Sequence, residues 1–361
     1  MGKVITFGEV MIRIHMKDHL RFRQALPGDA ELTFAGAEAN VAVSIALLGG
    51  EAAFVTALPS HSISDALTGE LRNLGVDTSK IIYTSRGRLG VYFVEAGANQ
   101  RPSNVLYDRD YSSIALEPLE SYNWKKIFEG ASWFHLTGIT PSLSKNAAAI
   151  SLEAVKIAKE QGLTVSCDLN FRKKLWQWES GTASGALAAR VMGTILPYVD
   201  ILIANEEDVQ EVLGIKADTV NTTTGAIEVE KYPELAAATA GKFPSLKKIA
   251  FTLRESISAS HNNWGAMLYD CKSGKAFFAP TAEGKFQPYP IVSIVDRIGG
   301  GDSFSAALIY AMMDDSLKDD ALAFATAASC LCHSIRGDFN FSSRAEVLAL
   351  MKGSTSGRIV R

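Results

Sequence analysis

From about residue 131 onward, short apolar runs alternate with longer stretches in which apolar residues recur every three or four positions. Runs such as Thr164–Asp168 and Ile201–Ala204 are typical of buried strands, and residues 144–161 predict an amphipathic helix. This alternation indicates an α/β fold with a mostly parallel central sheet covered by helices on both faces. The other elements expected here are strands at 132–136 and 248–253 and helices at 184–196, 206–213 and Tyr232–Lys242.

The N-terminal third of the chain contains a second pattern. Residues 10–15, 89–96 and 104–109 alternate between apolar and polar side chains, as half-exposed strands do. They fit a buried parallel sheet poorly, so we expect a small β-sheet that projects as a lid over the strand ends, formed by about residues 10–34 and 88–112. The core elements expected in this part are strands at 3–8 and 52–57 and helices at 38–48 and 64–74.

The chain shows neither an internal repeat nor a low-complexity linker, so residues 1–361 are expected to form one domain. A polar, threonine-rich loop is expected at 218–225. An alanine-rich helical stretch contains Cys330, Cys332 and His333, which we interpret as buried helix and not as a metal site, because no second pair of ligands accompanies them.

A glycine-rich turn at residues 296–304 (DRIGGGDSF) stands out near the C-terminal end. The preceding run at 291–295 predicts a strand, and an apolar helix is expected to follow over 304–313. Three consecutive glycines at a strand-to-helix junction let backbone N–H groups and the helix N-terminus meet an anion. Asp302 is then either the N-cap of that helix or a base beside a phosphoryl group in transit.

Polar residues follow several predicted strands at their carboxyl ends. In open α/β sheets, ligands bind along that edge. Five clusters on one rim are hard to explain as unrelated helix caps, so they favour a functional site. The clusters are residues 36–40, 168–172, 205–208, 252–254 and the glycine turn.

The composition of the chain excludes several classes of binding partner. The 361 residues include 36 basic and 39 acidic ones, and the net charge of −3 gives no basic field for nucleic acid. The longest weakly polar stretch, residues 321–332, is too short for a membrane span, so neither nucleic acid nor membrane is an expected partner. The four cysteines lack the spacing of a disulfide framework, which favours a cytoplasmic location.

Common nucleotide-binding motifs are missing from the sequence: it has no G-x-x-x-x-G-K-[ST], no G-x-G-x-x-G after the first strand, and no protein-kinase motif set. A glycine turn, one aspartate and remote charged groups suit phosphoryl transfer to a small alcohol, in which positioning and charge stabilisation dominate.

These residues resemble the ribokinase (phosphofructokinase-B) family of sugar kinases along essentially the whole chain. Residues 296–304 correspond to the family signature D-T-x-G-A-G-D-x-F, with Arg297 in place of the usual threonine and Gly300 in place of alanine. Residues 35–42 (AGAEANVA) correspond to the N-terminal signature. The resemblance implies a ribokinase-like three-layer α/β/α core, and within the family it is strongest to kinases of 2-keto-3-deoxygluconate.

The resemblance also implies roles for individual residues. Asp302 would be the catalytic base, and the backbone N–H groups of Gly299, Gly300 and Gly301 would stabilise the transferring phosphoryl group. Magnesium–ATP is the implied donor. Asn205 begins a metal and phosphate motif in which Asp208 replaces the usual glutamate and would reach Mg²⁺ through water. The other expected ATP contacts are Thr252, Arg254, where the family usually has glycine, and Asn340.

The expected substrate rests mainly on Arg172. A guanidinium is a planar partner for the carboxylate of an acid sugar, so we expect phosphorylation of 2-keto-3-deoxygluconate at its terminal C6 hydroxyl. An ordinary surface salt bridge is the alternative role for Arg172. A neutral-sugar kinase of the same fold, of the fructokinase or ribokinase type, and a catalytically silent binding relative also remain alternatives. The other expected sugar contacts are Gly36, Asn40, Tyr92, Tyr107 and Arg109.

Family resemblance further suggests a homodimer formed through the β-lid, because an open sheet edge invites pairing. A monovalent cation such as K⁺ near Asp296 is left open, as is the preference for gluconate or galactonate derivatives. His135 and His333 are interpreted as packed or capping histidines.

Overall fold

The computed structural model describes residues 2–215 and 229–354, so the loop expected at 218–225 lies outside the described residues. The main sheet has the strand order β13-β12-β11-β10-β9-β8-β1-β4-β5, and β16 pairs with β12. Neighbours from β5 to β11 are parallel, whereas β12 pairs antiparallel with β11, β13 and β16. The strands are β1 (Lys3–Phe7), β4 (Ala52–Pro59), β5 (Ile81–Thr84), β8 (Ala131–Thr137), β9 (Thr164–Asp168), β10 (Ile201–Ala204), β11 (Lys248–Ser258), β12 (His261–Asp270), β13 (Lys275–Ala279) and β16 (Tyr289–Ile291).

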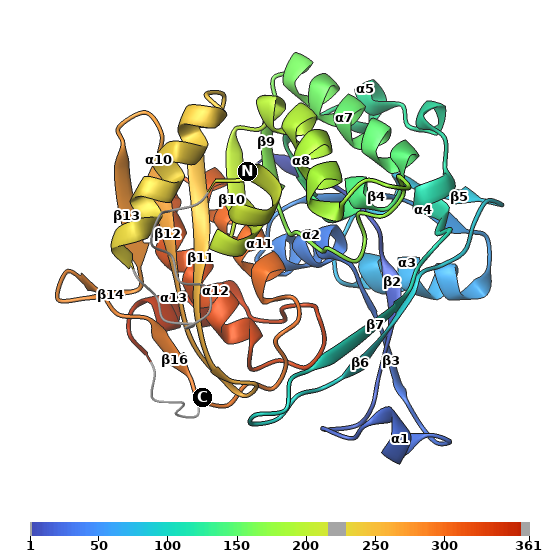
Figure 1. Cartoon of the computed structure of the whole chain (residues 1–361), viewed down its shortest axis with the longest axis horizontal. Helices are drawn as coiled ribbons and strands as arrows, with labels where there is room; N and C mark the ends of the chain where they lie inside the picture. Colours follow the sequence, from blue (N-terminus) through green and yellow to red (C-terminus); the bar gives the residue numbers. More distant parts are fainter. Residues whose placement is uncertain (1, 216–228, 355–361) are drawn as a thin grey trace.

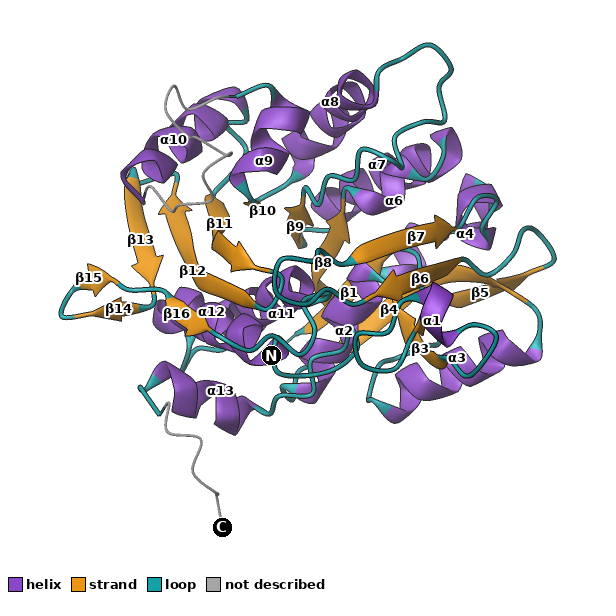
Figure 2. Ribbon diagram, turned by 60° about the horizontal axis from the view of Figure 1, so that its bottom comes forward, coloured by secondary structure: helices purple, strands orange, loops and turns teal. Residues whose placement is uncertain are grey.

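Helices cover the main sheet in two layers, on its opposite faces (Figure 2). Strand β1 shows why, because Ile5 and Phe7 pack into one apolar cluster with α7 and α8, while Val4 belongs to another with α2 and α3. The expected three-layer α/β/α architecture is therefore confirmed. One layer holds α4 (Ser113–Leu116), α5 (Trp124–Ile127), α6 (Ile139–Ser142), α7 (Lys145–Glu160), α8 (Ser184–Ile195), α9 (Glu206–Asp208) and α10 (Tyr232–Lys242), and the other α2 (Ala37–Leu47), α3 (Ser62–Asn73), α11 (Gly300–Met313), α12 (Ala321–Cys332) and α13 (Arg344–Met351).

The small projecting sheet is also confirmed. Its strand order is β3-β2-β6-β7, and it extends away from the core on one side of the molecule with the short helix α1 (Phe22–Ala25) at its end (Figure 1). Met11, Tyr92 and Val94 pack on its buried side. The strands are β2 (Met11–His15), β3 (Glu31–Ala35), β6 (Val91–Glu95) and β7 (Asn104–Asp108), and a separate hairpin joins β14 (Thr281–Ala282) to β15 (Lys285–Phe286).

Two expectations around the glycine turn are wrong. The strand predicted at 291–295 is limited to β16, which ends at Ile291, because Val292 and Val295 are 68% and 47% exposed and face no neighbouring strand. The helix predicted from Phe304 begins at Gly300. Two of the glycines therefore belong to the first turn of α11, which places their N–H groups at the helix N-terminus.

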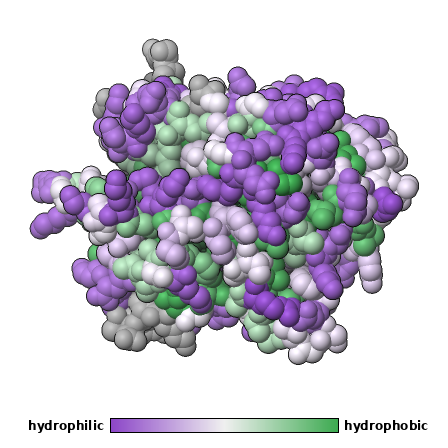
Figure 3. Space-filling view, turned by 90° about the horizontal axis from the view of Figure 1, so that it is seen from above, coloured by the Kyte–Doolittle hydropathy of each residue, from purple (hydrophilic) through white to green (hydrophobic). Residues whose placement is uncertain are grey.

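The strand predicted at 248–253 continues to Ser258 and forms a long antiparallel hairpin with β12, which the sequence pattern had not indicated. On the face of the molecule shown in Figure 3, hydrophilic side chains cover most of the outward parts, and hydrophobic residues are visible between them. Among the described residues, no helix is both long and apolar enough to cross a membrane.

Candidate active site

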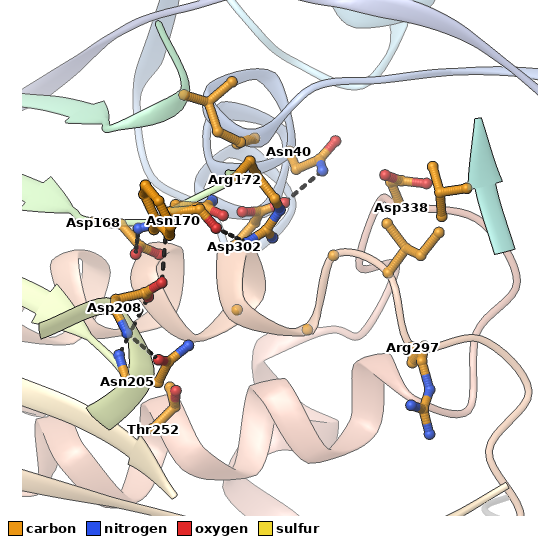
Figure 4. Close-up of a pocket in the computed structure, with 18 of the residues that line it drawn as sticks. Asn40, Asp168, Asn170, Arg172, Asn205, Asp208, Thr252, Arg297, Asp302 and Asp338 are labelled. Carbon is orange, nitrogen blue, oxygen red and sulfur yellow. Dashed lines mark hydrogen bonds between the residues drawn. The ribbon is translucent and has the colours of Figure 1, made fainter. Parts of the chain in front are cut away.

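A cavity of about 610 Å³ lies at the carboxyl ends of the parallel strands, beneath the small sheet. All five polar clusters of the sequence analysis contribute to its wall, through Gly36, Asp168, Asn205, Thr252 and Gly301 among others. In Figure 4, Asn40 and Arg172 lie on one side of Asp302, while Thr252 and Arg297 lie on the other. The cavity therefore has two ends, with Asp302 between them.

The glycine turn has a different steric constraint at each position. Gly299 is the N-cap of α11 with a φ of 85°, and a Cβ there would collide with the carbonyl oxygen of Asp338. A Cβ on Gly300 would lie 2.9 Å from the His333 ring. At Gly301, no heavy atom lies within 4 Å of the corresponding position. An anion can therefore approach the first turn of α11 over Gly301, where N–H groups and the helix dipole favour negative charge.

Asp302 is the third residue of α11, so the N-cap alternative is wrong; the cap is Gly299. Its carboxyl group is buried and accepts a 2.7 Å hydrogen bond from Asn40 Nδ2. Burial raises the pKa of Asp302 to about 7, the Asn40 bond opposes this, and the charges of Asp338 and Glu38 add to it. A carboxyl group that exchanges its proton near neutral pH has the property that a general base needs.

Asn40 and Gly36 meet on the other side of this carboxylate. Asn40 Oδ1 accepts a 3.2 Å hydrogen bond from the Gly36 N–H, which orients the amide so that its nitrogen points to Asp302. A side chain at residue 36 would collide with the Glu9 carbonyl group, so only glycine fits there. The two predicted sugar contacts are thus brought together beside the predicted base.

The two arginines expected to contact the sugar have different surroundings. Arg172 is exposed at the cavity, its Nη1 donates a 3.0 Å hydrogen bond to the Phe171 carbonyl, and no described carboxylate lies within ion-pair distance of it. The surface salt bridge considered for Arg172 is therefore not found in the described part of the chain. Arg109 is buried, donates to Glu9 Oε2 with a 2.7 Å bond from Nε, and lies over the Tyr107 ring. Its charge is already neutralised.

A buried ionic cluster lies on the far side of the glycine turn. Arg13, on β2 of the small sheet, pairs with both Asp338 and Asp296. The Tyr92 hydroxyl contacts both carboxylate oxygens of Asp338, at 2.9 and 2.8 Å. Asp296 also accepts the N–H of Ile298 at 3.2 Å. The hydroxyl of Tyr92, a predicted sugar contact, is thus hydrogen-bonded to Asp338, and Asp296, near which a monovalent cation was left open, is paired with Arg13.

The predicted ATP contacts only partly converge. Asn205, Thr252 and Arg254 line the cavity, but Asn340 does not. The Asn340 amide is buried, donates to Ser303 Oγ at 2.6 Å and to the Ala328 carbonyl at 3.0 Å, and accepts the Ser342 N–H. Its side chain thus links α11 to α12, and its role as a nucleotide contact stays a prediction.

Asp208 lies buried at the wall of the cavity. Its oxygens accept the N–H groups of Phe171, at 3.0 Å, and Asn205, at 3.4 Å, and burial raises its pKa to about 6. The described residues include no group of three or more potential metal ligands. This donor set fits Mg²⁺ only in the manner usual for nucleotide complexes, in which one or two carboxylates act together with waters and phosphates.

The histidines behave as expected. His135 is fully buried, shares a 2.9 Å hydrogen bond with Ser166 Oγ, and burial lowers its pKa to about 3, so it stays neutral. His333 lines the cavity, but its Nδ1 is hydrogen-bonded to the Ser329 carbonyl at 2.8 Å. Several lining residues had not been predicted as contacts, and of these only Glu9, next to the first strand, and Arg297, in the glycine turn, carried a local signal. They are Glu9, Ser256, Asn262, Trp264, Arg297 and Asp338.

The turn amides favour an anion, and Asp302 can take up a proton near neutral pH. Together with the α/β fold, these properties define the class of small-molecule kinases. Comparison with known proteins then gives the family. The chain belongs to the pfkB family of carbohydrate kinases, whose model matches residues 1–248 and 268–342, so the expected family and enzyme class are confirmed.

Individual relatives refine this result. The solved structure of 2-dehydro-3-deoxygluconokinase from Thermotoga maritima is 44% identical, with a TM-score of 0.86 over 98% of this chain and 100% of that one. The 2-dehydro-3-deoxygalactonokinase of Haloferax volcanii is 30% identical over 99% of this chain and 98% of the relative. Fructokinase-1 of Oryza sativa subsp. japonica is 26% identical over 97% and 98%. The chain is thus a carbohydrate kinase similar to kinases of keto-deoxy sugar acids.

Proposed function

We propose that this kinase transfers the γ-phosphoryl group of ATP to the terminal C6 hydroxyl of 2-keto-3-deoxygluconate. The observation that carries the proposal is the position of the buried Asp302 carboxyl group, between the open backbone at Gly301 and the exposed guanidinium of Arg172 in one cavity. A base, an anion site and a partner for a substrate carboxylate thus lie within reach of one small molecule.

Asp302 would accept the hydroxyl proton while the sugar oxygen forms its bond to the γ-phosphorus. The bond between that phosphorus and the bridging oxygen breaks, and ADP leaves with the electron pair. The N–H groups at Gly299–Gly301 and Asp302 would stabilise the charge on the equatorial oxygens. Bound Mg²⁺ would neutralise phosphate charge, and Asp208 is the residue proposed to hold it through water.

The choice of an acid substrate rests on Arg172. An exposed guanidinium without a described carboxylate partner can form a charge-assisted, bidentate contact with a substrate carboxylate. Two relatives named for keto-deoxy sugar acids support this choice. The fructokinase relative is the observation that favours the second candidate, a neutral-sugar kinase.

An ADP-release assay over 2-keto-3-deoxygluconate, its galactonate isomer, fructose and ribose tests the proposal. We expect turnover with the acid sugars, and a KM for them about 10- to 100-fold higher in Arg172→Ala, the range expected for loss of a hydrogen bond to a charged group. Lys173→Ala removes a neighbouring exposed cation and serves as the control. Equal effects of Arg172→Ala on acid and neutral sugars would refute the acid preference.

We also propose that the chain forms a homodimer through the small sheet. Leu32 on β3 and Leu106 on β7 are 53% and 49% exposed, and Leu26 beside α1 is 51% exposed. Covering such side chains is favourable. Light scattering is expected to give twice the chain mass for the wild type and the chain mass for Leu32→Asp combined with Leu106→Asp; a monomeric wild type would contradict the proposal.

A further inference from the structure

One end of the cavity is built on a single face of the β11–β12 hairpin. The register places Arg254 opposite Trp264 and Ser256 opposite Asn262, and directly opposed residues of antiparallel strands share a face. All four line the cavity. Arg297, from the glycine turn, lines the same cavity and donates from Nη2 to the carbonyls of the hairpin tip at Ser258 and Ala259, at 3.3 and 2.8 Å. The hairpin thus holds Arg297 in place.

Two guanidiniums, those of Arg254 and Arg297, lie at this end of the cavity, which Glu206 and Glu207 also line. No described carboxylate lies within ion-pair distance of Arg254 or Arg297. The pKa of Arg297 is lowered, first by burial and then by the charge of Arg254. Asp296 acts in the opposite direction, but its carboxylate is paired with Arg13. Burial raises the pKa of Glu206, and the charge of Arg254 opposes this rise.

Buried polar atoms without partners occur at the same place. Within the described residues, Asn262 Oδ1, Trp264 Nε1 and Arg297 Nε have no hydrogen-bond partner, although Asn262 and Trp264 are only 1% and 5% exposed. Leaving a buried donor or acceptor unsatisfied costs about 1–3 kcal/mol. Trp264 Nε1 and Arg297 Nε are donors, which an anionic ligand would satisfy, whereas Asn262 Oδ1 is an acceptor and needs a donor group.

We propose that Arg254 and Arg297 together bind the phosphates of the donor nucleotide, so that affinity at this end depends on the number of phosphates. Guanidinium groups match phosphate oxygens in pairs and keep their charge at every relevant pH. Arg297 stands where the family signature has threonine, and Arg254 where the family usually has glycine, so both positions depart from the family pattern. The inference rests on the proposed use of ATP, but not on the identity of the sugar.

Calorimetric titration of the full-length chain with ATP, ADP and adenosine, in the presence of Mg²⁺ and without sugar, tests the pair. For Arg254→Gln and Arg297→Gln we expect ATP binding to weaken about 10- to 100-fold each, because each removes hydrogen bonds to a charged group. ADP binding should weaken less, and adenosine binding should change less than about twofold. Arg190→Gln removes an exposed cation on α8, paired with Glu179, and is the control.

Arg254→Lys keeps the positive charge but loses the forked geometry of the guanidinium. Its affinity for ATP should therefore lie between those of the wild type and Arg254→Gln. Thermal unfolding without ligand identifies any variant that is simply misfolded, and the Arg254 variants, altered at an exposed side chain, then carry the test. Unchanged ATP affinity in both glutamine variants, or an equal loss for adenosine and ATP, would overturn the inference. A neutral-sugar result in the substrate panel would overturn the proposed substrate and leave this inference standing.

Discussion

Two groups of carboxylates flank the glycine turn, and their partners differ. On one side, Asp302 faces the neutral amide of Asn40 at 2.7 Å. On the other, Asp296 and Asp338 share the guanidinium of Arg13, which is itself only 2% exposed. Burial would lower the pKa of Arg13, but the two carboxylates raise it, so the guanidinium keeps its charge.

The difference shows how carboxylates beside one turn can have different roles, one group structural and the other able to accept a proton. A carboxylate paired with a guanidinium is stabilised as an anion, because the opposite charge favours its ionised form. Burial raises the pKa of both Asp338 and Asp302; at Asp338 the charge of Arg13 and its hydrogen bond oppose the rise, whereas at Asp302 the Asn40 amide opposes it and the pKa is about 7. The first arrangement fixes the turn to the small sheet, and the second leaves a group that can take up a proton.

The largest expected effect is on turnover. Asp302→Asn keeps the shape and the buried position but removes the base, so we expect kcat to fall about 10²- to 10⁴-fold, the usual contribution of general base catalysis. ATP affinity, measured by titration, should remain near the wild-type value. Asp315→Asn, at an almost fully exposed carboxylate, is the control. Turnover within twofold of wild type would remove Asp302 from the mechanism.

Removing the guanidinium of Arg13 from the cluster on the other side of the turn should lower the stability of the fold. Arg13→Met leaves Asp296 and Asp338 buried without a counter-ion, and removing one partner of a buried pair typically destabilises a protein by about 3–5 kcal/mol. Urea unfolding of this variant, compared with Arg190→Met at an exposed pair, measures the loss. A loss below about 1 kcal/mol would show that the cluster is no stronger than a surface pair.

The same contrast explains what the sequence could predict. The α/β core follows from local periodicity, and Asp302 was identified because the glycines that define its surroundings are its neighbours in the chain. Arg13 and Asp338 are 325 positions apart, and neither carries a local signal, so their pairing appears only in the fold. The contacts of Asn340 could not be predicted for a related reason: an amide looks the same in sequence whether it faces a ligand or, as here, donates to Ser303.

The smallest expected effect concerns the hydrogen bond from Asn40 to Asp302, which has no counterpart at the carboxylates paired with Arg13. The Asn40 amide lowers the pKa of Asp302 against the larger effect of burial. In Asn40→Ala that pKa should therefore rise above its wild-type value of about 7. A base acts in its deprotonated form, so the acid limb of kcat/KM should move to higher pH by about one unit, equivalent to about 1.4 kcal/mol. At pH 7 this appears as a roughly fivefold loss, since the deprotonated fraction falls from about one half to about one eleventh, and alkaline pH restores the rate.

Asn40→Asp makes the test sharper, because a carboxylate at residue 40 can still accept the Gly36 N–H while replacing the donor to Asp302 with a like charge. Its acid limb should move further than that of Asn40→Ala, since neighbouring carboxylates disfavour each other's ionisation. Asn104→Ala, on the exposed strand β7, should leave the profile unchanged. If both Asn40 variants lowered the plateau of kcat/KM without moving the limb, Asn40 would act on the sugar and not on the base. The contrast between an amide-held and a guanidinium-held carboxylate would then not explain why Asp302 titrates near neutral pH.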